Sequence, residues 1–245
     1  MAAGSETMSI WGKLAGAAAG LAFGGPLGAL FGGVAGHAVD RTLSDSGHDR
    51  QVAFTMGVIA LGAKMAKADG VVTISEIQAF KEVFKIPPGE EHNVARVFNL
   101  AKQDVAGFEM YARQLGRLLR NDRQLLEDVL DGLFHIAISD GQLLPAEDQF
   151  LADVAKEFGF THIDYMGIRG RHFRCDLYDP YTVLSVSPNI SDADLKAKYR
   201  KLVAENHPDK LIARGVPAEF IEIATKKLAA INAAYDEIRQ SRHAI

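Results

Sequence analysis

The order of hydrophobic and polar positions divides the chain into three segments. The first is an uncharged stretch from Leu14 to Val39. From about residue 51 to 160, apolar positions recur at helical spacing with few strand-like alternations. Two amphipathic helical patterns follow, over about 194–206 and 217–239. The pattern predicts an all-α protein with an N-terminal Gly-rich membrane helix, a helical bundle and a C-terminal helical hairpin.

The uncharged stretch is long enough to cross a bilayer. At about 1.5 Å per residue, a helix over residues 14–39 would be roughly 39 Å long, against a hydrocarbon core of about 30 Å. Glycine recurs at every fourth position, which gives a helix a face of small residues on which a second helix can pack. We expect membrane lipid around residues 14–39 and a possible homodimer through the glycine face, which consists of Gly16, Gly20, Gly24, Gly28, Gly32 and Gly36.

Other interpretations of this stretch remain open. A flexible Gly/Ala linker has a similar composition. A cleaved signal peptide fits poorly, because Lys13 is the only basic residue before the apolar run and the run is too long. Gly25 and Pro26 lie at mid-span, where they allow a kinked helix or a re-entrant hairpin.

The middle segment contains an internal repeat, with an offset of 71 residues between Asp69 and Asp140. Each of these residues is followed by Gly, and seven residues after each comes a Glu, Glu76 or Glu147. Each copy predicts a helix, a tight Asp-Gly turn and a second helix. In the second copy, Pro145 suits the first turn of the second helix. Two such hairpins would make an all-α bundle.

This duplication resembles the TerB-like domain, named for tellurite-resistance proteins, over roughly residues 51–160. Its four repeated carboxylates, Asp69, Glu76, Asp140 and Glu147, could meet around a divalent metal ion, since hard cations need several carboxylate oxygens. The alternative is that each one supports a turn or caps a helix N-terminus. We favour the capping role, because capping alone explains the spacing.

The C-terminal segment predicts two antiparallel helices joined by His207-Pro208-Asp209 and a polar loop. Ser191 or Asp192 can cap the first helix. Its inner face consists of Leu195, Tyr199 and Leu202, and its outer face is basic at Lys196, Arg200 and Lys201. The apolar face of the second helix consists of Leu228, Ile231, Tyr235 and Ile238.

These features resemble the J domain over nearly all of residues 179–240. The Tyr-x-Val-Leu start, the Lys-Tyr-Arg-Lys-Leu helix, His-Pro-Asp-Lys and Ile231-Asn-Ala-Ala-Tyr235 occur in the family's order. The resemblance implies a co-chaperone that docks on a DnaK-type chaperone and stimulates its ATPase. It implies no cofactor and no enzyme activity of its own. The implied partner-binding residues are Lys196, Tyr199, Arg200, Lys201, His207, Pro208, Asp209 and Lys210.

The three segments together resemble the membrane-anchored DnaJ-like protein A family of co-chaperones. This implies a bacterial inner-membrane protein with a single span and cytoplasmic C-terminal domains. The fourth J-domain helix is missing or reduced to residues 241–245. A metal- or ligand-sensing membrane adaptor with an accessory J domain is an alternative, as is a mitochondrial import motor.

The composition of the chain excludes several classes of function. The 245 residues carry a net charge of −4 and are 48% hydrophobic, enough for a substantial core. No region is basic enough to suggest nucleic acid as a partner. Cys175 is the only cysteine, which excludes an internal disulfide and a cysteine-based zinc module.

Predicted boundaries follow from these patterns. They are an N-terminal tail (1–13), the membrane helix (14–39), a linker (40–50), the TerB-like domain (51–165), a basic linker (166–177) and the J domain (178–245).

Overall fold

The computed structural model describes residues 47–68, 95, 98–99, 102, 107–173, 179–213 and 220–243. Regular structure in this part of the chain is helical, without a strand. The helices are α3 (Gly47–Ala68), α6 (Phe108–Leu118), α7 (Arg123–Ala137), α8 (Pro145–Glu157), α9 (His162–His172), α10 (Pro180–Val183), α11 (Asp192–Glu205), α12 (Pro208–Ala213) and α13 (Ile221–His243). The prediction of an all-α protein is confirmed.

The predicted membrane helix, residues 14–39 with its glycine face, lies outside the described residues. Among the helices that are described, none combines the length and apolarity needed to cross a bilayer.

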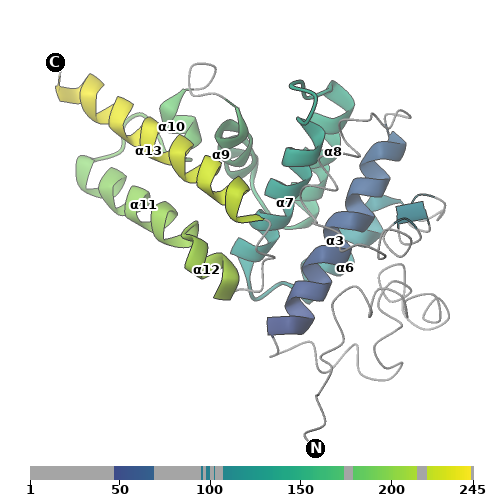
Figure 1. Ribbon diagram of the computed structural model, residues 1–245. Coiled ribbons are helices and arrows are strands. Elements are labelled where there is room, and N and C mark those ends of the chain that lie inside the picture. Colours follow the sequence, from purple (N-terminus) through teal and green to yellow (C-terminus); the bar gives the residue numbers. More distant parts are fainter. Residues whose placement is uncertain are drawn as a thin grey trace, which may run out of the picture.

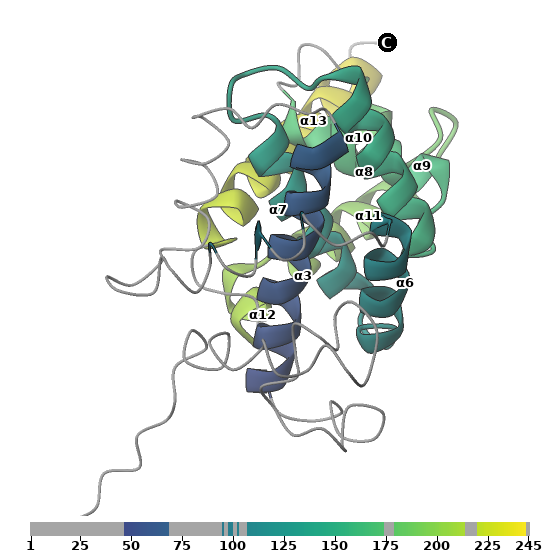
Figure 2. The same ribbon diagram turned by 90° about the vertical axis from the view of Figure 1, so that its right-hand side faces the viewer.

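Helices α3, α6, α7, α8 and α9 form a bundle, with α3 lying against α6, α7 and α8 (Figures 1 and 2). The bundle encloses one continuous apolar core. All five helices contribute fully or almost fully buried side chains to it, among them Phe54, Leu61, Leu115, Leu125, Phe134, Leu151 and Ile168. Removing this apolar surface from water is the main stabilising contribution to the bundle.

Local hydrogen bonds fix where these helices begin and end. The Asp122 carboxylate accepts from the Leu125 N–H at 3.0 Å and caps α7. Thr161 and Asp164 form a reciprocal capping box at the start of α9, with bonds of 2.8 and 3.2 Å. After α8 the chain turns at Gly159, whose φ of 82° is a left-handed conformation that suits glycine.

The second copy of the repeat has the predicted form. α7 is followed by a tight turn at Asp140-Gly141 and then by α8, with Pro145 in its first turn. In the first copy, α3 occupies the helical part, whereas Asp69 and Glu76 lie outside the described residues.

Helices α11 and α13 lie side by side as the predicted hairpin, with α10 packed between α13 and α9 (Figure 1). The hairpin is antiparallel, since Arg242 near the end of α13 pairs at 2.6 Å with Asp192 at the start of α11. A second apolar cluster joins the three helices through Val183, Leu184, Leu195, Leu202, Ile231, Ala234 and Ile238. The predicted inner positions are confirmed for Leu195 and Leu202, which are buried, and Tyr199 is half-buried beside them.

Two parts of the predicted layout differ from the structure. Of the stretch 166–177 that was expected to be a basic linker, residues 166–172 belong to α9 instead. The reason is packing, because Ile168 is buried in the bundle core and the side chain of Arg171 is buried as well. The last helix runs to His243, past its expected end near residue 239.

Helix α13 belongs to both cores. Ile223 and Ala224 in its first turns join the bundle core, whereas Ile231 and Ile238 further along join the hairpin core. The hairpin is therefore joined to the bundle by a shared helix.

Candidate functional site

The His-Pro-Asp corner is the start of a helix, not the loop that was predicted. The His207 carbonyl accepts hydrogen bonds from the N–H groups of Lys210 at 2.9 Å and Leu211 at 3.2 Å. Pro208 is the first residue of α12, a position where its fixed φ fits and its missing N–H costs nothing. The corner is thus internally hydrogen-bonded.

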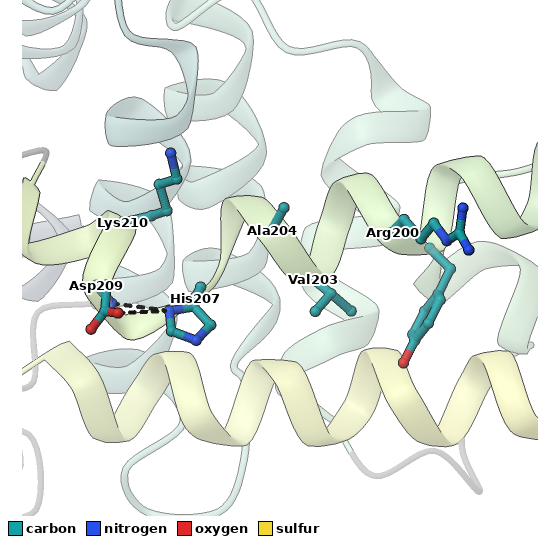
Figure 3. A pocket seen from close by; sticks show the side chains of 7 residues that line it. Arg200, Val203, Ala204, His207, Asp209 and Lys210 are labelled. Atoms are coloured by element: carbon teal, nitrogen blue, oxygen red, sulfur yellow. Dashed lines mark hydrogen bonds and ion pairs between the residues drawn. The ribbon is translucent and has the colours of Figure 1, made fainter.

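The His207 and Asp209 side chains face each other at the surface (Figure 3). His207 Nδ1 accepts from the Asp209 N–H at 3.3 Å, and it lies 3.7 Å from Asp209 Oδ2. The two side chains are 55% and 88% exposed. Most of the Asp209 carboxylate is therefore open to accept hydrogen bonds from another molecule.

A groove runs from the corner along α11. It has a volume of about 430 Å³ and is lined by Tyr199, Arg200, Val203, Ala204, His207, Asp209 and Lys210. Figure 3 shows the labelled side chains of this set following α11 down to the corner. The groove brings together five of the eight residues that the J-domain resemblance implied.

The remaining three, Lys196, Lys201 and Pro208, lie on the same elements. Lys196 and Lys201 are exposed on α11, as are Arg200 on that helix and Lys210 on α12. We call these four cations the basic ridge. Within it, Lys201 has a loose contact of 3.8 Å with Glu205, so its charge remains available to a partner.

Tyr199 holds α11 against α13. Its ring stacks on that of Tyr235 with centroids 4.0 Å apart, and its hydroxyl donates to Asn232 Oδ1 at 3.1 Å. At the end of α11, the buried Asn206 side chain donates to the Leu202 carbonyl at 2.7 Å. These bonds fix the direction in which the hairpin presents its corner.

A buried charge network lies between the hairpin and the bundle, and the sequence did not reveal it. Lys227 Nζ on α13 donates to Glu127 Oε1 and to Asp131 Oδ2 on α7, both at 2.6 Å. Arg171 on α9 donates to the same Glu127 oxygen at 2.6 Å, and His172 Nε2 lies 2.7 Å from Asp131 Oδ1. The Lys227 side chain is only 1% exposed.

The network sets the charge states of its members. Burial acts to raise the pKa of the Asp131 carboxyl, but the Lys227 charge and the His172 hydrogen bond outweigh it and hold that pKa well below its usual 3.8. Burial likewise opposes the Lys227 and Arg171 charges at Glu127, and the pKa of Glu127 is still lowered. Burial alone would lower the pKa of Lys227, but the two carboxylates raise it. All three groups are therefore charged at neutral pH.

The structure gives the carboxylates of the second repeat local roles. Asp140 Oδ1 accepts from the Gln142 N–H at 2.9 Å, and Glu147 Oε2 accepts from the Leu144 N–H at 2.9 Å. These are the turn and cap roles that we favoured over metal binding. In the part of the chain that is described, no group of three or more potential ligands forms a metal site. The other two candidate ligands, Asp69 and Glu76, lie outside that part.

Three family models match the chain. The model for the tellurite resistance protein TerB matches residues 55–170, and that for the DnaJ domain matches residues 179–243. The model for the transmembrane domain of the co-chaperone DjlA matches residues 8–51. Together with the exposed corner and the basic ridge, these matches define a membrane-anchored J-domain co-chaperone.

Similar proteins from several bacteria share most of their length with this chain. The co-chaperone protein DjlA of Photobacterium profundum is 30% identical over 274 residues, which cover 95% of this chain and 99% of the relative. The DjlA proteins of Legionella pneumophila and Escherichia coli are 29% and 27% identical, over 95% and 96% of this chain and 95% and 99% of the relatives. No solved structure matches it. The chain belongs to the DjlA family of co-chaperones.

Proposed function

We propose that the chain docks on a DnaK-type chaperone through the basic ridge and the His-Pro-Asp corner and stimulates that partner's ATP hydrolysis. A J-domain co-chaperone has a DnaK-type partner. To this the proposal adds which residues of the chain make the contact and in which of the two proteins ATP is hydrolysed. Hydrolysis takes place in the partner, whose conformational equilibrium shifts on docking, and this chain is not itself an enzyme.

The observation that carries the proposal is the exposure of the corner at the end of a cationic helix. Asp209 is 88% exposed. A carboxylate held in this way can accept charge-assisted hydrogen bonds from an arginine of the partner. Pro208 keeps the backbone of the corner in place while that contact forms.

The basic ridge steers the encounter with the partner electrostatically. Lys196, Arg200 and Lys201 project from one helix toward solvent, so they can attract an acidic face of the partner's ATPase domain. Charges of this kind raise the association rate and fix orientation more than they raise affinity. Tyr199 adds the apolar wall of the groove beside them.

The location of the chain completes the proposal. The partner needs ATP, so we place the C-terminal domains in the bacterial cytoplasm, after one span of the inner membrane over residues 14–39. Lipid surrounds that span, and its glycine face pairs with a second copy. The TerB-like domain and the J domain follow it, over the matched ranges 55–170 and 179–243.

A kinetic experiment tests the ridge. The full chain, reconstituted in lipid nanodiscs, is mixed with a DnaK-type chaperone, and the association rate is measured by stopped-flow fluorescence. We expect the triple substitution Lys196→Glu, Arg200→Glu, Lys201→Glu to slow association by about 10- to 1,000-fold, the range that electrostatic steering can supply.

The matched control reverses charge on the neighbouring helix. Lys226 and Arg239 are exposed on α13 and are not part of the ridge. Lys226→Glu with Arg239→Glu should leave the association rate near the wild-type value. If this pair slows association as much as the ridge variant does, net charge alone drives the encounter and the proposed contact is wrong.

A further inference from the structure

The corner continues into a helix that is anchored in the bundle. Leu211, in the first turn of α12, is 3% exposed and belongs to the core cluster of the bundle, not to that of the hairpin. Its N–H is also one of the two that bond to the His207 carbonyl. The residue that holds α12 in the bundle is therefore one of those that shape the corner.

A second anchor precedes α13. The ring of Phe220 meets that of Phe54 on α3 edge to face, with centroids 4.8 Å apart. On its other side the ring presses on Gly132 of α7, where an added Cβ would lie 2.6 Å from a ring carbon. Phe220 is 2% exposed. The Phe220 ring thus fits against α7 because residue 132 is glycine, and a larger side chain there would displace the ring.

The third anchor is Lys227, which completes a stripe that begins at Phe220 and continues along α13. Phe220, Ile223, Ala224 and Lys227 recur at the spacing of one helix face, and all four are buried. Figure 1 shows the N-terminal end of α13 beside α7. The apolar part of the stripe enters the bundle core, and Lys227 binds the two carboxylates of α7.

We propose that the middle bundle positions the His-Pro-Asp corner, so that Phe54, Gly132, Glu127 and Asp131 act on chaperone docking through Leu211, Phe220 and Lys227. This rests on the proposed function of the corner. The TerB-like region is then a structural part of the docking site. None of these seven residues is expected to touch the partner, and each is a positioning residue.

Apolar contacts and the charge network both link the hairpin to the bundle. Separation would leave Lys227 without either carboxylate and would leave Glu127 and Asp131 with one of these neighbours each, Arg171 or His172. It would also expose the Phe220 ring. Because Leu211 and Phe220 are buried in the bundle core, α12 and the corner are already ordered when the partner arrives. Pre-ordering lowers the entropic cost of binding and so strengthens it.

The test combines hydrogen exchange with chaperone stimulation, on the full chain in lipid nanodiscs. Phe220→Ala removes the ring, and Lys227→Met breaks the charge network. The two variants change different anchors, so either one alone carries the test should the other fail to fold. Exchange of the Lys210 and Leu211 amides reports on α12. Single-turnover ATP hydrolysis by a DnaK-type chaperone, titrated with each variant, gives the half-saturating concentration and the maximal rate separately.

We expect both variants to speed exchange in α12 by about tenfold or more while α11 stays protected. The half-saturating concentration should rise by about five- to tenfold, because part of the binding free energy is then used to order α12. The maximal rate should stay within about twofold of wild type, because the contact with the partner is itself unchanged. A general loss of folded protein would also raise the half-saturating concentration, by lowering the active fraction, but it would deprotect α11 together with α12, so the exchange of α11 separates the two cases. Arg242→Gln, which breaks the Asp192 pair at the far end of the hairpin, is the control and should change neither quantity.

Two results would overturn the inference. In the first, α12 exchange is unchanged in the folded variants, so the bundle does not order the corner. In the second, exchange rises but the half-saturating concentration does not, so the order has no effect on docking. Failure of the proposed function looks different, because wild type would then not stimulate at all, or His207→Gln would stimulate as well as wild type.

Discussion

The ammonium group of Lys227 lies 2.6 Å from the Asp131 carboxylate, although the two residues are 96 positions apart in the sequence. Both are buried. Desolvating two charges is costly, and their attraction offsets that cost only with good geometry and further hydrogen bonds. Here His172 and Glu127 supply those additional contacts. The pair therefore fixes where the last helix sits on the bundle.

Removing the cation should destabilise the protein strongly. Lys227→Met removes the cation shared by the buried Asp131 carboxylate and by Glu127, whose side chain is 14% exposed, and losing one partner of a buried pair costs about 3–5 kcal/mol. Urea unfolding followed by circular dichroism measures the change. The matched control is Lys226→Met, one residue earlier, whose ammonium group contacts Glu222 at the surface and should be worth about 0–1 kcal/mol. Equal losses in the two variants would mean that the buried network does not hold the fold.

Stability should depend on pH through Asp131. Its pKa in the folded protein lies below the usual 3.8, so its contribution is fully present above that pH and is lost as the pH falls through the folded value. Glu127, whose pKa is also lowered, contributes to the same loss of stability at acid pH. The unfolding free energy measured between about pH 2 and pH 7 should fall steeply below about pH 4, and the fall should be shallower in Asp131→Asn. If the unfolding free energy of that variant falls as steeply below about pH 4 as that of wild type, Asp131 is not the group responsible.

A glycine at the contact between α9 and α10 should tolerate no side chain. An added Cβ at Gly167 would lie 1.8 Å from Ser185 Oγ and 3.1 Å from the Thr182 carbonyl oxygen. We expect Gly167→Ala to cost about 1–3 kcal/mol, because the helices must move apart. Gly116→Ala in α6 is the control. The nearest atom to its Cβ is 3.5 Å away, so the better helix former should stabilise by about 0.5–1 kcal/mol. Thermal unfolding distinguishes the two, and a loss of equal size at both glycines would refute the close contact.

Docking should weaken with salt in a way that the ridge controls. Exposed charges are screened over about 8–10 Å at physiological ionic strength. The association rate of the full chain with a DnaK-type chaperone should therefore fall steeply between about 0.05 and 0.5 M salt. In the variant that reverses Lys196, Arg200 and Lys201, the slope should flatten or change sign. A wild-type slope in that variant would place the steering charge elsewhere.

The sequence was informative wherever function depends on a short motif. Ser191 was one of two residues proposed to cap the first hairpin helix, and its hydroxyl accepts from the Asp194 N–H at 3.1 Å. The burial of Leu195 and Leu202 followed from helical spacing, which reflects local geometry alone. The corner was identified from its residue types, but its helical start at Pro208 was missed, because a Pro-Asp pair between two helices also suits a turn.

Long-range contacts could not be predicted in the same way. Lys227 lies on an otherwise apolar stripe, which was the one available signal of a buried cation, but nothing local identifies Glu127 and Asp131 as its partners. The helix over 162–172 was missed for a related reason. Its three basic residues in the last turn are typical of an exposed connector, and only tertiary packing buries Arg171.

The most direct test of the docking account is single-turnover ATP hydrolysis by a DnaK-type chaperone with the full chain in nanodiscs, comparing wild type with His207→Gln. The imidazole of His207 is 55% exposed and its Nδ1 contacts the neighbouring Asp209 within the corner, so the substitution should leave the fold intact. We predict that wild type accelerates hydrolysis by about tenfold or more and that His207→Gln does not. Equal acceleration by both proteins would contradict the account.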